Sequence, residues 1–235
     1  MEIYNLCVEV TRRCNMQCEH CLRGDAQNKD IKDYVMSKFL TSNKITYIST
    51  VTFTGGEPFL NLESINNFID LCKNLDIGIG SFYIATNGKT YSNEVLNTML
   101  KLYSYCDDNE ISQLHISNDI YHSNEGQEQE IINKLMLFRF TSLKDELDYK
   151  HVIAEGRGVE IAELNGTIDN ARIIKAEKNF KDFEELNEYT IYLNVDGDVL
   201  SECDLSYERQ SEEKLFNIFN PKCCTFEMFF KNNEK

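Results

Sequence analysis

The sequence predicts an α/β fold in which the strands of a parallel sheet alternate with helices, followed by a small C-terminal extension. The first observation is that strand-like and helix-like patterns alternate over the first two-thirds of the chain. The second is that glycine-bearing turns directly follow strand patterns, and the third is an Asp-Gly hairpin near the end. Right-handed crossovers can curl such a sheet into a full or partial barrel or leave it open, and periodicity does not distinguish these.

Each element has its own signal. Runs rich in β-branched and apolar residues predict five strands at Ile3–Val10, Tyr47–Thr54, Ser81–Ala85, Leu114–Ser117 and Tyr149–Ala154. Apolar stripes predict four helices, which run from Ile31 to Phe39, from Ile65 to Cys72, after the capping residue Ser92 to Tyr103, and from Gln127 to Phe140. A hairpin is expected from Ile191–Val195 and Asp198–Leu200. We therefore expect a core over residues 1–188 and a hairpin with a cap over residues 189–235.

Composition and charge narrow the class of protein. The chain has 235 residues, of which 42% are hydrophobic, as in folded globular proteins. No apolar run approaches the about 18 residues of a membrane-spanning helix, and the N-terminus lacks a signal-peptide pattern, so we expect a cytoplasmic protein. The formal net charge of −15 argues against nucleic acid and anionic membranes as partners.

Three closely spaced cysteines form the most informative motif. Cys14, Cys18 and Cys21 lie on one short loop after the first strand. Clustered cysteines in a reducing compartment indicate a metal site, and thiolates favour iron–sulfur clusters or zinc. Three cysteine ligands on a four-iron cluster leave one iron open for another ligand. Structural zinc and an electron-transfer cluster with a distant fourth cysteine remain alternatives.

The Cys-x3-Cys-x2-Cys motif resembles the signature of the radical S-adenosylmethionine (radical SAM) superfamily. The sequence Thr54-Gly55-Gly56-Glu57-Pro58, after the second strand, resembles the Gly-Gly-Glu-Pro element of the same family. The resemblance covers about residues 3–158. It implies a partial (β/α)6 radical SAM barrel, with a [4Fe-4S] cluster at the strand ends where barrel enzymes place their chemistry.

The resemblance also implies a set of cofactor-binding residues at the strand ends. Paired glycines let the backbone approach a ligand closely. Thr86-Asn87-Gly88 and Ser117-Asn118-Asp119 resemble family elements at the third and fourth strands. Apart from the resemblance, Arg157, in the turn expected to follow the fifth strand, can bind the cofactor carboxylate or a substrate anion, or be an exposed arginine. His122 can face the substrate or be a surface residue. The expected contacts to S-adenosylmethionine come from Gly55, Gly56, Glu57, Thr86, Asn87, Ser117, Asp119 and Arg157.

The reaction that the resemblance implies is reductive cleavage of S-adenosylmethionine to methionine and a 5′-deoxyadenosyl radical, which abstracts hydrogen from a substrate. An external donor of the flavodoxin or ferredoxin type would supply the electron. The substrate is a peptide or, alternatively, a small molecule such as a nucleotide. A non-catalytic iron–sulfur or zinc module is a third alternative. The tail cysteines Cys203, Cys223 and Cys224 lack the paired spacing of a second cluster.

Overall fold

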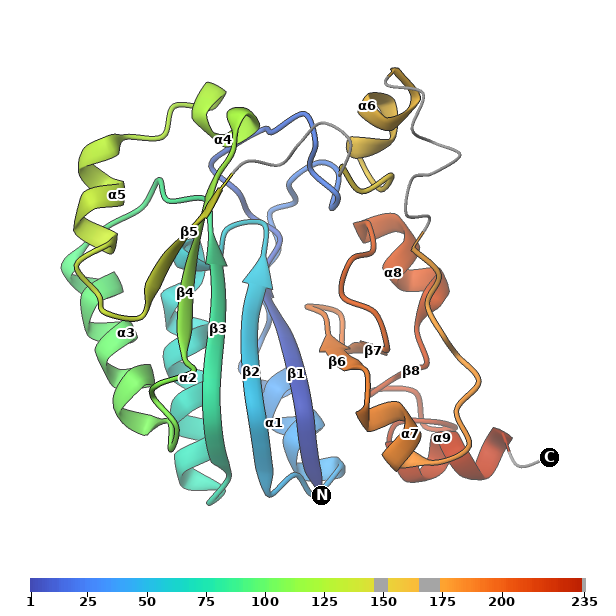
Figure 1. The fold of residues 1–235 in the computed structure, drawn as a ribbon. Coiled ribbons are helices and arrows are strands. Elements are labelled where there is room, and N and C mark those ends of the chain that lie inside the picture. The colour runs from blue at the N-terminus through green and yellow to red at the C-terminus, as the bar shows by residue number, and fades with distance from the viewer. Residues whose placement is uncertain (146–151, 165–173, 234–235) are drawn as a thin grey trace.

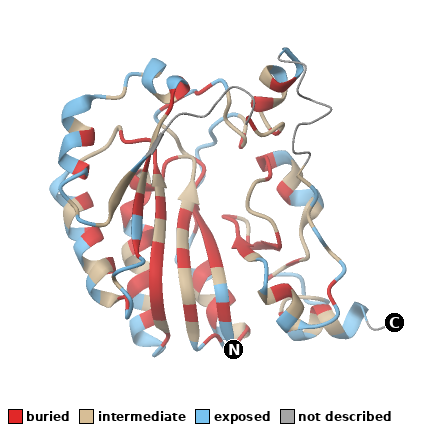
Figure 2. Ribbon diagram, viewed as in Figure 1, coloured by how far each residue is buried: buried red, intermediate tan, exposed pale blue. Residues whose placement is uncertain are grey.

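A computed structural model describes residues 1–145, 152–164 and 174–233 of the chain, which form an α/β fold around one sheet. The sheet has eight strands in the order β5-β4-β3-β2-β1-β6-β7-β8. Its central strands are β1 (Glu2–Thr11), β2 (Tyr47–Gly55), β3 (Gly78–Thr86) and β4 (Gln113–Asn118). They pair in parallel, as the alternating pattern predicts, and fully buried strand residues run through the middle of the sheet (Figure 2).

Helices cover the outer face of the sheet, beside the strands that precede and follow them (Figure 1). The connections contain α1 (Asp33–Ser42), the short 3-10 helix η1 (Pro58–Asn61), α2 (Leu62–Asn74) and α3 (Asn93–Tyr105). Ser92 caps α3, because its side chain accepts a hydrogen bond from the Val95 N–H as predicted. Phe53 of β2 and Phe68 of α2 meet edge to face in the core between sheet and helices.

The region after β4 differs from the sequence prediction. Helix α5 (Gln129–Leu135) is shorter than the helix expected from Gln127 to Phe140, and a short helix that was not expected, α4 (Ile120–Asn124), precedes it. The fifth strand, β5, is Thr141–Asp145 and pairs in parallel with β4. Of the segment expected as this strand, residues 149–151 lie outside the described residues, and residues 152–154 are not in a strand.

The C-terminal part continues the same sheet. Strands β6 (Thr190–Leu193) and β7 (Asp198–Leu200) form the expected antiparallel hairpin, and β8 (Phe216–Asn217) extends it. Strand β6 also pairs in parallel with β1, so the sixth parallel strand lies beside the first strand rather than after β5. The remaining helices are α6 (Gly158–Leu164), α7 (Phe183–Asn187), α8 (Tyr207–Glu213) and α9 (Phe226–Asn233).

This arrangement is a partial barrel whose parallel strands all point their carboxyl ends toward the loop of Cys14, Cys18 and Cys21 (Figure 1). None of the helices in the described part of the chain is both long and apolar enough to cross a membrane.

Candidate active site

A cavity of ≈ 670 Å³ lies at the carboxyl ends of the parallel strands and extends along their inner face. Its walls come from the cysteine loop, the ends of β2, β3 and β4, the turn before α6 and the segment before α8. The lining includes the predicted residues Cys14, Cys18, Cys21, Gly55, Gly56, Asn87, Ser117, Asp119, His122 and Arg157. Residues from five segments distant in sequence therefore meet in one place.

Hydrogen bonds between the end of β1 and residues 27–30 hold the cysteine loop in place. The Arg12 N–H donates to the Lys29 carbonyl at 2.8 Å, and the Gln27 N–H donates to the Arg12 carbonyl at 2.9 Å. The Thr11 hydroxyl donates to Asp30 at 2.6 Å. Both ends of the loop are thus fastened to the end of β1, so its cysteines have a fixed place above the sheet.

The three cysteines lie close enough for their charges to influence one another. Burial raises the pKa of the Cys14 thiol, and burial together with the charges of Cys14 and Cys21 raises the pKa of Cys18 to about 12. Cysteine binds metal as the thiolate, so metal binding at this loop must displace protons.

The spacing of the sulfurs distinguishes a cluster from a single ion. Within the described ranges, two groups of three ligand atoms lie within 4.8 Å of one another, and the three cysteine sulfurs are not one of them. Sulfurs around one zinc ion would be only about 3.8 Å apart, given zinc–sulfur bonds of about 2.3 Å. The wider arrangement on one loop fits a four-iron cluster better than a single zinc ion.

Gly55 and Gly56 bring β2 against the cysteine loop. Gly55 has a φ of +150°, and a Cβ there would collide with the backbone of Thr11. A Cβ on Gly56 would collide with the Arg13 carbonyl and lie 3.0 Å from the Cβ of Cys14. The glycines line the cavity, and their lack of side chains is required by this close approach of the chain to itself.

Glu57 and Thr86 are placed behind the cavity rather than in its lining. The buried Glu57 carboxylate accepts hydrogen bonds from the N–H groups of Phe59 (3.0 Å) and Asn87 (2.7 Å). It also accepts one from the Thr86 hydroxyl at 2.9 Å. Burial raises the pKa of Glu57. These two residues join the end of β2 to the end of β3.

Asn87 and Ser117 lie where β3 and β4 end. The Asn87 side-chain amide donates to the Asn15 side chain at 2.8 Å and is 3.8 Å from the sulfur of Cys14. The carbonyls of Asn87 and Ser117 both accept from the Gln127 amide, at 2.7 and 2.6 Å. Gln127 therefore ties these two strand ends together, and both residues line the cavity.

Asp119 lies at the centre of a small polar group at the start of α4. One carboxylate oxygen caps α4 by accepting from the Tyr121 and His122 N–H groups, and the other is 2.8 Å from the His122 Nδ1. His20 lies 3.7 Å from the same oxygen and stacks on Tyr121 with ring centroids 4.3 Å apart. Burial lowers the pKa of His20 to about 4, so its ring is neutral near pH 7.

Arg157 lines the cavity from the turn before α6, which the described chain does not place after a strand. Its Nε donates to the Cys18 carbonyl at 3.0 Å, and its backbone N–H donates to the Cys21 carbonyl at 3.0 Å. Its Nη1 pairs with Asp25 at 2.9 Å. Arg157 thus braces the cysteine loop and faces the cavity at the same time.

The cavity also has a wall that the sequence did not indicate. It contains Cys7 of β1, Arg23 just after the cysteines, and Cys203, Asp204 and Tyr207 from the C-terminal part. The one signal of this wall in the sequence was the position of Arg23, two residues after Cys21. The tail residues gave no signal, because they reach the cavity only through the pairing of β6 with β1.

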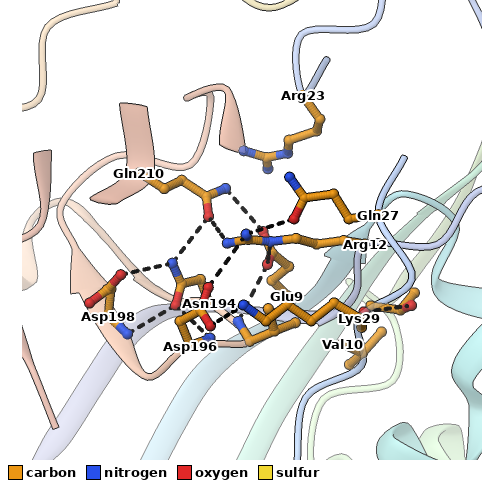
Figure 3. Close-up of polar contacts among 12 residues, drawn as sticks. Glu9, Val10, Arg12, Arg23, Gln27, Lys29, Asn194, Asp196, Asp198 and Gln210 are labelled. Carbon is orange, nitrogen blue, oxygen red and sulfur yellow. Dashed lines mark hydrogen bonds and ion pairs between the residues drawn. The ribbon is translucent and has the colours of Figure 1, made fainter. Parts of the chain in front are cut away.

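A buried polar network fastens this tail wall to β1 (Figure 3). The Glu9 carboxylate pairs with Arg12 at 2.7 Å and accepts from the Tyr192 hydroxyl at 2.7 Å and the Gln210 amide at 3.0 Å. Arg12 also donates to Gln210 of α8 at 2.8 Å. One set of buried hydrogen bonds therefore joins the start of the cysteine loop to β6 and α8.

Comparisons with known proteins agree with this site. A family model described as a 4Fe-4S single cluster domain matches residues 6–132, more than half of the chain. The chain is 27% identical over 193 residues to 7-carboxy-7-deazaguanine synthase of Clostridium acetobutylicum, covering 77% of this chain and 81% of that protein.

Two further relatives have partial or distant similarity. The chain is 31% identical over 103 residues to the uncharacterized protein MJ0907 of Methanocaldococcus jannaschii, covering 41% of this chain and 34% of that protein. The match thus spans about a third of that relative's length. The solved structure of native anSMEcpe with bound AdoMet and Kp18Cys peptide superposes with a TM-score of 0.50 at 14% identity, over 100% of this chain and 82% of that one, which supports the fold.

The family match covers the cysteine loop and the first four strands, where the predicted site residues converge on one cavity. Thiolates on one loop suit iron–sulfur chemistry, and the cavity is large enough for a nucleoside-sized cofactor. The chain therefore belongs to the 4Fe-4S single cluster domain family and is a radical S-adenosylmethionine enzyme, whose cofactors are a [4Fe-4S] cluster and S-adenosylmethionine.

Proposed function

We propose that the chain cleaves S-adenosylmethionine reductively and that the reaction removes a hydrogen atom from a substrate bound in the same cavity. The observation that carries this proposal is the single cavity lined by the three cysteines, the paired glycines and the polar ends of β3 and β4. When bound, a reduced cluster supplies the electron that breaks a carbon–sulfur bond of S-adenosylmethionine, which gives methionine and a 5′-deoxyadenosyl radical.

The residues of the cavity have separate parts in this proposal. Cys14, Cys18 and Cys21 hold the cluster. We assign contact with the methionine end of the cofactor to backbone groups of Gly55, which lies against Thr11, and of Gly56, which lies beside Cys14. Polar groups that line the strand ends and the turn before α6 bind the rest of the cofactor, and they belong to Asn87, Ser117, Asp119 and Arg157.

Glu57 and Thr86 support the site in a different way. The hydrogen bonds that the Glu57 carboxylate accepts from the Thr86 hydroxyl and the Asn87 N–H fix the two strand ends at which the cofactor would lie. We therefore assign to them the positioning of Gly56 and Asn87 rather than direct contact with the cofactor.

A small molecule is the substrate class that we favour. A cavity of ≈ 670 Å³ lies within the range of about 300–1,000 Å³ found for small-molecule sites, and it must hold the cofactor as well. The relative 7-carboxy-7-deazaguanine synthase, which aligns with most of this chain, bears the name of a small-molecule enzyme. A peptide is the second candidate, because the structure of anSMEcpe contains one. We further propose a cytoplasmic location and a flavodoxin- or ferredoxin-type electron donor.

The test is cleavage by anaerobically reconstituted protein. With dithionite as reductant, the parent should convert S-adenosylmethionine to 5′-deoxyadenosine, measured by chromatography. Cys18→Ala should abolish this conversion, whereas Cys72→Ala, which alters a buried cysteine outside the cavity, should retain it. Cluster-loaded parent that gives no 5′-deoxyadenosine with several reductants would contradict the proposal.

A further inference from the structure

Arg23 is a buried cation in the tail wall of the cavity. Its exposed fraction is 8%, and it lies two residues after Cys21. Its Nη1 donates to the Leu205 carbonyl at 2.6 Å, and its guanidinium carbon lies 5.1 Å from the centre of the Tyr192 ring. These contacts fix the orientation of the guanidinium group, but neither of them supplies a negative charge.

Within the described residues, no carboxylate lies within 4.0 Å of the Arg23 nitrogens. Glu9 is the acidic group of the neighbouring network, and its two oxygens are already taken by Arg12, Tyr192, Gln210 and the Val195 N–H. Figure 3 shows Arg23 beside this network, with no dashed line joining it to the other residues drawn. The charge of Glu9 acts on Arg23 from a longer distance, but no ion pair among the described residues occupies the guanidinium group, which is therefore available to an anionic group of a ligand in the cavity.

Tyr207 gives a second, independent sign at the same place. Its exposed fraction is 7%, it lines the cavity, and its hydroxyl is buried without a hydrogen-bond partner in the described part of the chain. Its N–H donates to the Arg23 carbonyl at 3.2 Å, and its ring lies 4.6 Å from the Arg12 guanidinium carbon. Burial raises the pKa of Tyr207, while the charge of the nearby Arg23 acts in the opposite direction. The hydroxyl is therefore a neutral donor held close to a cation.

We propose that Arg23 and Tyr207 together anchor a carboxylate group of the substrate. This inference rests on the proposed function, because it places the substrate at the tail wall of the cavity in which the cofactor would bind. Arg23 supplies the charge and a charge-assisted hydrogen bond, and Tyr207 donates the second hydrogen bond through its free hydroxyl. The anchor holds the substrate beside Cys21.

The charges of the tail wall favour a ligand group with one negative charge over a ligand group with two. Asp204 lines the same end of the cavity, so a phosphate dianion would meet an acidic side chain with only one unpaired cation to balance it. A carboxylate carries one charge, and its two oxygens can accept from Arg23 and from Tyr207. A free small acid and the C-terminus of a peptide both present this group.

The test is a binding experiment on the reconstituted enzyme, without oxygen and with saturating S-adenosylmethionine. Calorimetry compares benzoate with benzamide, which has nearly the same shape and no charge. Benzoate should bind at least about tenfold more tightly than benzamide, because a hydrogen bond to a charged group contributes that much or more. Triglycine is compared with its C-terminal amide to test binding of a peptide C-terminus. Inorganic phosphate is measured in the same way to test binding of a dianion.

Three variants probe Arg23 and Tyr207 themselves. Tyr207→Phe removes one oxygen atom that has no partner in the described chain, so folding should be unharmed while benzoate binding weakens about tenfold. Arg23→Met removes the charge and should weaken benzoate more strongly, and Arg23→Lys should restore part of the affinity. Arg139→Met and Tyr4→Phe, both at exposed positions, are the matched controls and should bind benzoate as the parent does.

The outcomes separate the two proposals. Tighter binding of benzoate than of triglycine would identify a small acid, and the reverse would identify a peptide C-terminus. Equal affinity for benzoate and benzamide, or parent-like benzoate binding by Tyr207→Phe, would overturn the anchor, as would phosphate that binds as tightly as benzoate. The binding measurement involves no turnover, so an absence of S-adenosylmethionine cleavage would count against the proposed function alone.

Discussion

The Asn87 N–H donates to the Glu57 carboxylate at 2.7 Å, which joins the residue after β3 to the residue after β2. The same carboxylate accepts from the Phe59 N–H and the Thr86 hydroxyl. All three donors are buried. Because Gly56 and Asn87 flank this contact and line the cavity, the stability of the fold and the shape of the site depend on the same carboxylate.

Glu57→Gln should lower the free energy of unfolding by about 1–3 kcal/mol, because the amide NH₂ would face a donor instead of accepting from it. Urea unfolding of the parent, Glu57→Gln and the exposed control Glu110→Gln measures this.

Burial raises the pKa of Glu57, so the folded chain holds the proton of this carboxyl at higher pH than the unfolded chain. The parent should therefore lose stability as pH rises above about 4.3, and Glu57→Gln should lack this contribution. A Glu57→Gln variant with the same free energy of unfolding as the Glu110→Gln control would contradict the role of Glu57.

Gly56→Ala should disturb the cysteine loop directly. The added Cβ would collide with the Arg13 carbonyl and press on Cys14, so the loop must shift. We expect lower iron content after reconstitution and weaker binding of S-adenosylmethionine, measured by iron analysis and calorimetry. A variant with full iron and parent-like affinity would show that the loop tolerates the movement.

The sequence identified the first four strands and the residues at their ends because these signals are local. Parallel strands such as Tyr47–Gly55 are rich in β-branched and aromatic residues, and the motifs follow them directly. The fifth strand was misplaced because Thr141–Asp145 is at the edge of the sheet, where β4 is its one partner among the described residues, and it has little apolar patterning. The apolar residues expected there have another role, since Val152 packs against Met16 and Cys18 of the cysteine loop.

The tail wall could not be predicted for a different reason. Arg23 and Tyr207 meet because β6 pairs with β1 and because Glu9 and Arg12 bond to Gln210, about 200 residues further along the chain. Contacts of this kind leave no periodic pattern in the sequence. The hairpin of β6 and β7 was predicted from Asp196-Gly197, but its attachment to the barrel was not.

Asp119 combines a structural and a cofactor-binding role that two substitutions can separate. Asp119→Ala removes the cap of α4 and should lower the free energy of unfolding by about 1 kcal/mol. Asp119→Asn keeps a capping oxygen and should fold as the parent does. We expect both variants to bind S-adenosylmethionine about tenfold more weakly by calorimetry, since each removes the charge. If only the alanine variant binds weakly, Asp119 acts through the helix alone.

Breaking the buried Glu9–Arg12 pair should strongly destabilise the chain. Glu9→Gln leaves Arg12 buried beside a neutral side chain, and such changes lower the free energy of unfolding by about 3–5 kcal/mol. The double variant Glu9→Gln/Arg12→Met should recover part of this loss, because it removes a buried charge whose remaining ion-pair partner is the partly exposed Asp196 at 3.4 Å. Glu130→Gln, which breaks an exposed ion pair with Lys134, is the control and should unfold at the same urea concentration as the parent. Urea titrations of all four proteins test this, and a Glu9→Gln variant as stable as the parent would contradict it.

The cysteines of the loop and those of the tail should differ in metal content. The triple variant of Cys14, Cys18 and Cys21 to alanine should lose the about four irons of the reconstituted cluster and its visible absorbance. The triple variant of Cys203, Cys223 and Cys224 to serine should keep them.

The reason lies in how the tail thiols are placed. Cys203 shares its group of three ligand atoms only with its sequence neighbours Glu202 and Asp204, and the other two tail thiols join no such group within the described residues. Adjacent residues such as Cys223 and Cys224 tend to direct their side chains apart, and Cys224 instead contacts the sulfur of Met228 at 3.6 Å. Iron and zinc per chain are measured on parent and both variants, purified side by side without oxygen. Loss of about four irons or one zinc from the tail variant would reveal a second metal site there and would shift our preference to a peptide substrate.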